Sequence, residues 1–319
     1  MLYADLTDRT YLCAPGRWDV MRCAACRAAY LDPRPSESTV HLAYREHYTQ
    51  AAGPSSAGEA SALRRLLQAL RNGYLNARYG YRAEPASRLG PLVVPLLGRR
   101  REQADELVRH LPAPAGRRRL LDVGCGEGTF LAEMQARGWE VQGIEPSAEG
   151  AAAARAHGVP VEQGTLAEVS LDPGSLDAIT FRLAFEALPD PPAALEKCRR
   201  GLAPGGTLWI ATPSLESLAH RRFGADWVFL DVPRSTILYT PSSLTRLLAA
   251  EGFPVQAVYP SRRAGWSFRL SAAIVRGRPP FRQPAELPAR LALEARLADV
   301  RARARPALAD MVVVVARRA

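Results

Sequence analysis

The sequence predicts an α/β protein built on a doubly wound, mainly parallel sheet. Between residues 101 and 260, apolar runs of strand length alternate with stretches of helical periodicity. A glycine-rich turn follows the first apolar run, at 119–123, and helix signals come directly after it. A second apolar run, at 140–144, ends in an acidic residue. In a doubly wound sheet these two turns lie at the ligand-binding edge.

The glycine turn has a spacing of its own. Glycines stand at 124, 126 and 128, whereas the dinucleotide fingerprint G-x-G-x-x-G would need one at Thr129. Glycine allows a sharp backbone turn and the close approach of a ligand. A tight turn without a ligand is the alternative interpretation, and the acid that ends the second strand argues against it.

That acid is Glu145, 17 positions after Gly128. A carboxylate at the end of the second strand of such a sheet accepts hydrogen bonds from ribose hydroxyls. An acid at a strand end is otherwise a solvated loop charge. The spacing after the glycine turn favours the binding role.

The other elements follow from turn signals and periodicity. Further strands are predicted at 159–161, 175–181, 207–211, 255–258 and 311–315, and helices at 151–156, 192–202 and 241–251. About fifty residues separate the last two strands. Within them Leu293, Leu297, Val300 and Ala304 recur at helical spacing, which predicts an amphipathic helix packed on its apolar stripe.

Length and composition exclude several classes of protein. The 319 residues are 47% hydrophobic, enough for a sizeable core, and no apolar run reaches the ~18 residues of a membrane span. Five cysteines are few for an oxidised scaffold, and the first residues lack the basic and apolar regions of a signal peptide. We therefore expect a cytoplasmic protein with no membrane partner.

The charge is uneven. The net charge is +10, and residues 261–319 hold thirteen arginines against four acidic residues, a net charge of +9. Such a patch suits nucleic acid, an acidic carrier protein or an anionic small molecule, or it is a solvated helix face. Sparse aromatic residues favour the solvated face, and no Asn/Asp-Pro-Pro-Tyr motif follows the fourth strand. We expect no nucleic-acid partner, and a carrier protein stays open.

Together the motifs resemble those of bacterial class I S-adenosylmethionine-dependent methyltransferases that carry an N-terminal zinc ribbon. The glycine turn has the E/D-x-G-x-G-x-G spacing of that class. The resemblance runs from Met1 to about Phe253 and includes Pro15–Asp19, Arg22–Cys26, Tyr30–Pro35, Pro189–Pro191, Ala203–Gly206, Ala211–Pro213, Phe223–Gly224, Trp227 and Leu230–Arg234.

The resemblance implies a Rossmann-like, seven-stranded methyltransferase sheet of order 3-2-1-4-5-7-6, with the seventh strand antiparallel. It implies a ribbon-like segment at 1–50 and a methyltransferase domain at 101–319 with a cap insertion at about 262–309. Between them, residues 51–100 are expected to form a linker and a helical lid. A stripe of leucines, Leu63, Leu66, Leu67 and Leu70, suits the lid.

The implied cofactor is S-adenosylmethionine, which leaves as S-adenosylhomocysteine. Asp122, Gly124 and Gly126 would surround its methionine portion, Glu145 its ribose, and 164–166 its adenine. The full set of expected cofactor-binding residues is Asp122, Gly124, Gly126, Gly128, Phe130, Glu145, Pro146, Gly164, Thr165, Leu166, Phe181 and Arg182.

The chain departs from the family at the ribbon. Of two Cys-x-x-Cys pairs only Cys23 and Cys26 are present, and the first pair would fall before Met1, so we expect a truncated ribbon. A structural zinc needs four ligands. Cys13 stands where the family has no ligand, and His41 and His47 lie in a helical pattern. We expect no bound metal.

A second departure follows the fourth strand. Where relatives read His-x-x-Glu-His, this chain reads Arg182-Leu183-Ala184-Phe185-Glu186-Ala187: neither histidine is present, Glu186 is kept, and a third common histidine is replaced by Ser235. Arginine is no base at neutral pH, but it binds anions in a forked geometry. Arg182 and Glu186 are thus the candidate catalytic residues, binding an anionic acceptor and accepting its proton. A plain surface pair at i, i+4 is the alternative.

Two functions remain open. One is methyl transfer to a small-molecule, biosynthetic acceptor, at oxygen or carbon. The other is a methyltransferase fold that binds the cofactor but has lost or exchanged its chemistry. The expected acceptor-binding residues are Phe185, Thr212, Trp227, Phe229 and Tyr239.

Overall fold

The computed structural model describes residues 1–35, 43–44 and 62–319, and its main sheet has the predicted strand order. The order β6-β5-β4-β7-β8-β11-β10 is the expected 3-2-1-4-5-7-6. β11 runs antiparallel to both of its neighbours, as expected for the last strand. The strands are β4 (Arg119–Val123), β5 (Glu140–Glu145), β6 (Val161–Gln163), β7 (Leu176–Arg182), β8 (Leu202–Pro213), β10 (Val255–Ser261) and β11 (Met311–Arg317).

The chain forms two compact units, and the division between them falls inside β7. One unit is Gly53–Thr180, and the other joins Met1–Ala52 to Phe181–Ala319. The first of these holds the predicted cofactor elements except Phe181 and Arg182. The second holds the predicted acceptor residues. No helix in the described part of the chain is long and apolar enough to cross a bilayer.

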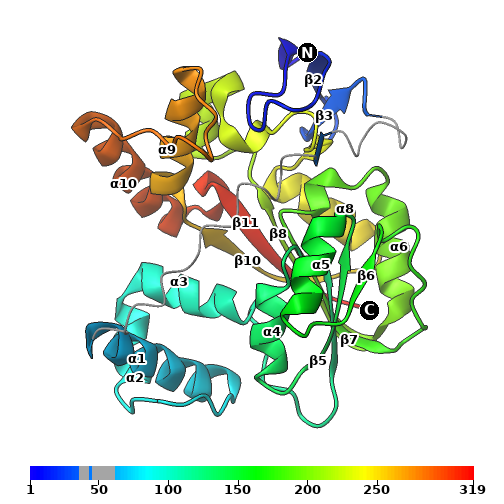
Figure 1. Ribbon diagram of the computed structural model, residues 1–319, viewed down its shortest axis with the longest axis vertical. Helices are drawn as coiled ribbons and strands as arrows, with labels where there is room; N and C mark the ends of the chain where they lie inside the picture. Colours follow the sequence, from blue (N-terminus) through cyan, green and yellow to red (C-terminus); the bar gives the residue numbers. More distant parts are fainter. Residues whose placement is uncertain (36–42, 45–61) are drawn as a thin grey trace. The chain divides into compact units, whose positions relative to one another are not determined.

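In the unit Gly53–Thr180, parallel strands β4, β5 and β6 pack against a buried cluster that includes Leu75, Leu120, Leu131 and Met134. The hydroxyls of Tyr74 and Tyr79 both donate to Asp105 Oδ1, at 2.8 and 2.9 Å. The helices are α1 (Ala62–Tyr79), α2 (Gly90–Val93), η2 (Val94–Leu96), α3 (Gly98–Leu107), α4 (Thr129–Gln135) and α5 (Ala148–Ala156), labelled in part in Figure 1.

The leucine stripe of α1 is only partly packed. Leu63 and Leu66 are 63% and 54% exposed, whereas Tyr74 and Leu75 in the second half of the helix are buried. Residues 51–61 of the predicted linker and lid segment, and the helical pattern around His41 and His47, lie outside the described residues.

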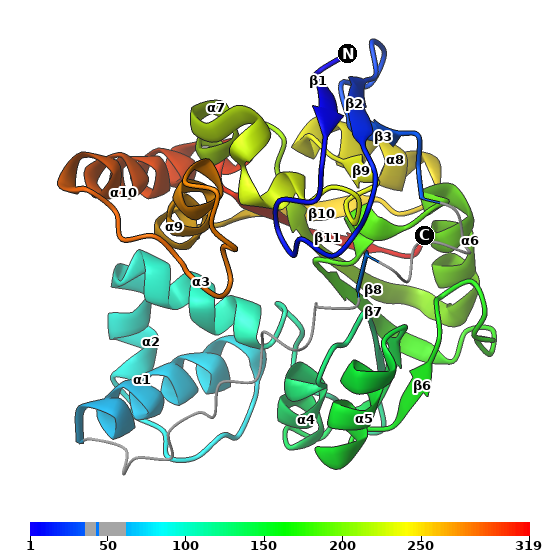
Figure 2. The same cartoon turned by 45° about the horizontal axis from the view of Figure 1, so that its top comes forward.

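The other unit contains a small antiparallel sheet of order β1-β2-β3-β9, seen at the top of Figure 2. Its strands are β1 (Tyr3–Leu6), β2 (Trp18–Arg22), β3 (Ala29–Asp32) and β9 (Ile237–Leu238). A strand that follows β8 in the sequence thus pairs with β3 and adds the fourth strand to a sheet of N-terminal strands. The unit's other elements are η3 (Phe185–Ala187), α6 (Pro191–Gly201), α7 (Leu218–Phe223), η4 (Gly224–Asp226), η5 (Val228–Leu230), α8 (Pro241–Ala250), α9 (Ala264–Val275), α10 (Ala289–Ala304) and η6 (Pro306–Leu308).

A buried ion pair fixes the N-terminal segment. Arg234 and Asp8 are 3% and 4% exposed, and Arg234 Nη2 donates to Asp8 Oδ1 at 2.5 Å. The Asp8 carboxylate also accepts backbone N–H groups of residues 10, 11, 13 and 14. Burial alone would raise the pKa of Asp8, but Arg234 and these N–H groups outweigh it and hold the pKa at about 2.

Two helices, α9 and α10, fill the interval between β10 and β11 and lie side by side in Figures 1 and 2. The predicted packing face of α10 is wrong. Leu293, Leu297 and Val300 are exposed, and the buried residues of the helix are alanines, Ala295, Ala298 and Ala302. Both stripes have helical periodicity, and the alanine face buries because small side chains allow a neighbouring helix to approach closely.

Candidate functional site

The glycine turn joins β4 to α4. Gly124, Gly126 and Gly128 have φ angles of 72°, 58° and 75°, the left-handed region that favours glycine. A Cβ on Gly128 would lie 2.8 Å from the Cβ of Ala154 in α5, so the third glycine serves the packing of the turn against a helix.

Glu145 is held against this turn. The residue is 3% exposed, its Oε2 accepts the N–H of Gly126 at 2.9 Å, and its Oε1 accepts that of Ser147 at 2.9 Å. Each carboxylate oxygen has a second lone pair for a further donor. Its backbone carbonyl accepts the N–H of Gly164 at 3.1 Å, which brings the 164–166 segment to the end of β5.

The 164–166 segment is itself braced. Glu168 Oε2 accepts the backbone N–H of Thr165 at 2.7 Å and its hydroxyl at 2.9 Å, and Leu166 is buried. Pro146, by contrast, is exposed. The structure thus brings the glycine turn, the acid and the predicted adenine segment together at the carboxyl ends of β4, β5 and β6.

Asp122 has protein partners that the sequence did not indicate. It is 1% exposed and forms an ion pair with Arg109, and Thr180 Oγ1 donates to its Oδ1 at 2.9 Å. Arg109 also donates to Thr180 Oγ1 at 2.6 Å, and its guanidinium lies 3.5 Å from the ring centre of Phe130. Arg109 belongs to a segment rich in arginine, and no motif distinguishes it from its neighbours.

These residues fit S-adenosylmethionine. A buried carboxylate with free lone pairs suits two ribose hydroxyls, and the left-handed glycines leave the backbone of the turn uncovered by Cβ atoms. Arg109 places a cation beside Asp122, so the predicted methionine end combines both signs of charge. Cys125 is no nucleophile at neutral pH, because burial raises the pKa of its thiol to about 12.

The predicted catalytic pair does not share a helix. Arg182 ends β7 and is half-buried, Leu183 follows at a φ of 55°, and Glu186 lies in the short helix η3. The expected i, i+4 helical spacing is therefore wrong, because the left-handed residue turns the chain directly after the strand. The side chain of Glu186 instead accepts the Thr212 hydroxyl at 2.9 Å.

Glu186 is a buried carboxyl poised near neutrality. It is 4% exposed, and burial, with a smaller contribution from Asp231, raises its pKa to about 7 although the Thr212 hydrogen bond opposes the shift. A carboxyl with this pKa can accept or release a proton at physiological pH.

Aromatic rings adjoin this acid. Phe185 lies next to Phe181 and Tyr239, with ring centres 5.4 and 5.5 Å apart. Glu186 is among the groups that raise the pKa of Tyr239, after burial, and the Tyr239 hydroxyl is buried without a hydrogen-bond partner among the described residues. Phe185, Glu186 and Tyr239 therefore lie close to one another, with Thr212 beside Glu186.

The other two predicted acceptor residues belong to a separate cluster. Trp227 and Phe229 are 5.7 Å apart between ring centres, and they neighbour His220 and Trp266 respectively. His220 was not predicted. It is buried between Tyr3 and the carbonyl of Leu215, and burial lowers its pKa.

The Cys23–Cys26 pair lies in the turn between β2 and β3, where the N–H of Cys26 points at Cys23 Sγ, at 3.4 Å. This N–H group is the main cause of the lowered pKa of Cys23. Across residues 1–35, 43–44 and 62–319, no group of three or more His, Cys, Asp or Glu side chains is arranged to hold a metal ion.

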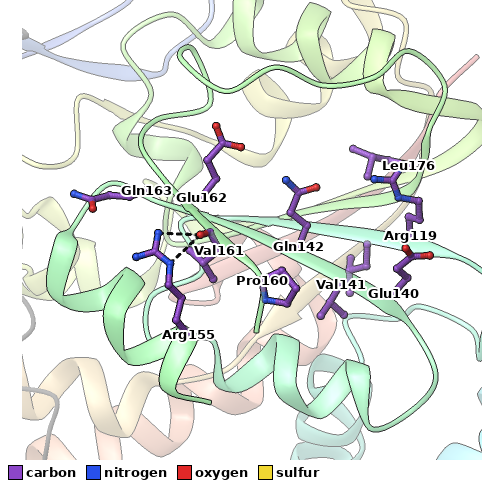
Figure 3. Close-up of a pocket in the computed structure, with 11 residues that line it drawn as sticks. Arg119, Glu140, Val141, Gln142, Arg155, Pro160, Val161, Glu162, Gln163 and Leu176 are labelled. Carbon is purple, nitrogen blue, oxygen red and sulfur yellow. Dashed lines mark hydrogen bonds between the residues drawn. The ribbon is translucent and has the colours of Figure 1, made fainter. Parts of the chain in front are cut away.

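A cavity of about 850 Å³ lies elsewhere in the unit Gly53–Thr180 (Figure 3). It is lined mainly by residues at the beginning of strands, such as Arg119, Glu140 and Leu176. Arg155 also lines it and donates to the Val161 carbonyl. Ligands of open α/β sheets bind at the carboxyl ends of strands. We therefore place the candidate site at the glycine turn and not in this cavity.

This fold and this turn define a class I S-adenosylmethionine-dependent methyltransferase domain. The family model described as a methyltransferase domain matches residues 96–258, about half of the chain, and the chain belongs to that family.

Named relatives agree with that class. The chain is 31% identical over 167 residues to a ubiquinone biosynthesis O-methyltransferase of Chromobacterium violaceum, covering 48% of this chain and 71% of the relative. It is 31% identical over 153 residues to the protein of the same name from Ralstonia nicotianae, covering 44% and 64%. The matches thus leave about half of this chain uncovered.

Solved structures are similar in fold alone. One, from Thermotoga maritima and described as a possible histamine N-methyltransferase, has a TM-score of 0.46 and 20% identity, covering 70% of this chain and 92% of that one. Another, the geranyl diphosphate C-methyltransferase of Streptomyces coelicolor, has a TM-score of 0.47 and 17% identity, covering 76% and 88%.

Proposed function

We propose that this protein transfers the methyl group of S-adenosylmethionine to a small-molecule, biosynthetic acceptor. The observation that carries the proposal is Glu145, a buried carboxylate held by two N–H groups against the glycine turn. The relatives named for O-methylation in ubiquinone biosynthesis support oxygen as the methylated atom, and carbon is the other acceptor atom that we consider.

The bound cofactor supplies an activated methyl group on a sulfonium. The chain's task is to align the acceptor for an in-line displacement, which lowers the barrier without a strong base. Glu145 and Gly164 would hold the nucleoside end. Asp122 and Arg109 would orient the methionine end, where their opposite charges suit its amino and carboxylate groups.

On the acceptor side, Glu186 would take the proton that the acceptor loses. Its pKa of about 7 suits a base that works at physiological pH. Phe185 and Tyr239 offer aromatic surface, and the Tyr239 hydroxyl has no hydrogen-bond partner among the described residues. Arg182, at the carboxyl end of β7, would bind an anionic acceptor, which is the class we propose. A carrier-bound acceptor and a cytoplasmic location also remain proposals.

The test of cofactor binding is Glu145→Ala, measured by calorimetry with S-adenosylhomocysteine. Loss of a hydrogen-bonded charge should weaken binding by roughly 1.5–3 kcal/mol. The matched control is Glu162→Ala, an exposed glutamate of β6, which should bind as the wild type does. Failure of the wild type to bind, or equal binding by both variants, would contradict the proposal.

The second candidate is a protein that binds the cofactor without methylating. The absence of all three histidines that are common in relatives favours it. Arg182→Leu tests the anionic acceptor once an acceptor is known. Unchanged kcat and KM in a folded variant would show that Arg182 does not bind the acceptor, whereas a raised KM supports an anionic acceptor. Tight cofactor binding without turnover of any phenolic or carboxylate acceptor would favour the second candidate.

A further inference from the structure

Helix α10 carries an exposed apolar seam. Leu293, Leu297 and Val300 are 57%, 45% and 60% exposed, and the exposed Ala304 continues the row. The steps along it are four, three and four residues, which is the a/d spacing of a two-helix coiled coil. A stripe this narrow is typical of a seam between two helices and not of a broad core face.

The opposite face of α10 is already packed. Ala295, Ala298 and Ala302 are buried, and Ala264 at the start of α9 donates its N–H to Asp299 of α10 at 3.2 Å. Glu294 accepts from Arg222 of α7 at 3.0 Å. These contacts fix the rotation of α10 about its own axis. The seam is therefore exposed because the opposite face of the helix is packed.

Arginines border the seam on both sides. At 100° per residue, Arg296 and Arg303 fall on one side of the leucine row, and Arg290 and Arg301 on the other. All four are exposed, and Glu294, the acid on this border, is paired with Arg222 and with Arg290. Charges at these flanking positions set the partner of a coiled coil.

We infer that the α10 seam docks an acidic amphipathic helix of a separate protein. The seam supplies apolar side chains at coiled-coil spacing, and its cationic borders match carboxylates at the flanking positions of the partner. With so short a row the interface is small, so the complex should be transient and sensitive to salt. This inference does not depend on methyl transfer.

Charge disfavours two other occupants, a second copy of α10 and helix α1. A second copy of α10 would bring the same arginines against these. Helix α1 also exposes leucines, Leu63 and Leu66, but its sequence contains no acidic residue and places Arg64 and Arg65 beside them. A lipid surface favours a broad apolar face with aromatic residues, and α10 has none.

The experiment uses the full chain and two fluorescein-labelled synthetic helices of about three heptads, both with leucine at the seam positions. One has glutamate at the flanking positions and the other has lysine. Fluorescence anisotropy should show binding of the glutamate peptide only, weakened at about 1 M salt. Leu293→Gln with Leu297→Gln should weaken it at least ten-fold. Arg296→Glu with Arg303→Glu, which changes one of the two cationic borders, should abolish the preference for the glutamate peptide.

The control is Leu92→Gln with Leu96→Gln, exposed leucines in and directly after α2, which should leave binding unchanged. Unchanged melting curves and S-adenosylhomocysteine binding establish that the variants fold. The inference is overturned if the glutamate peptide does not bind, or binds the seam variant equally well. Seam-dependent dimers in light scattering, or seam-dependent binding to phosphatidylglycerol vesicles, would also overturn it, in favour of a second copy or a lipid surface.

Discussion

Because of Glu186, the stability of its unit should fall as pH rises, and Glu186→Gln should remove this dependence. The carboxyl is buried and its pKa is raised from 4.5 to about 7. As pH rises, this carboxyl therefore ionises in the unfolded chain before it ionises in the folded one. Its contribution to the free energy of unfolding is fully favourable below pH 4.5 and is lost by about pH 7. At 1.36 kcal/mol per pKa unit, the loss is roughly 3 kcal/mol.

Glutamine keeps the shape of the side chain and an oxygen for the Thr212 hydroxyl, but it does not ionise. The variant should therefore gain roughly 3 kcal/mol relative to the wild type between pH 4.5 and 8. Denaturant titrations followed by tryptophan fluorescence measure this, because Trp209 and Trp227 are buried in the same unit. Asp310, another buried acid of this unit, is present in both proteins and cancels. Parallel curves for the two proteins would refute a poised Glu186.

Three further outcomes are expected. Gly128→Ala should lower the melting temperature and the affinity for S-adenosylhomocysteine, because the new Cβ would lie 2.8 Å from that of Ala154. Gly116→Ala is the control, since Gly116 has a φ of 80° but a Cβ there would meet no described atom within 4 Å; equal effects of the two variants would contradict the packing role. Arg234→Met should cost about 3–5 kcal/mol in denaturant titrations, since it leaves Asp8 as an unpaired buried charge, and a loss below about 1 kcal/mol would show that the pair is dispensable. S-adenosylhomocysteine binding should survive EDTA, and one zinc per chain found by elemental analysis would contradict the expectation of no metal.

The main sheet could be predicted because its signals are local. Each strand is a short apolar run bounded by turn residues, and the resemblance supplied the strand order, including the antiparallel β11. The contact of Glu145 with the glycine turn was equally predictable, because adjacent parallel strands bring their carboxyl ends to one edge.

What could not be predicted depends on contacts between distant segments. The pairing of β3 with the two-residue β9 joins positions about 200 apart, and so short a strand carries no periodicity. Arg109 was missed because only the fold places it beside Asp122. The packed face of α10 was misjudged because an alanine stripe and a leucine stripe share one periodicity, and hydrophobicity alone selects the leucines.

Burial raises the pKa of two acids near the end of β8, Glu186 and Asp310. Glu186 hydrogen-bonds to Thr212 near the end of β8, and two residues on, Ser214 donates its N–H to the carbonyl of Asp310 at 2.9 Å. Burial raises the pKa of both acids to about 7. Asp310 Oδ2 has no hydrogen-bond partner among the described residues. An imidazole titrates in the same pH range, at about 6.5. Two desolvated carboxyls with raised pKa values therefore lie near this end of β8, in a chain that has none of the three family histidines.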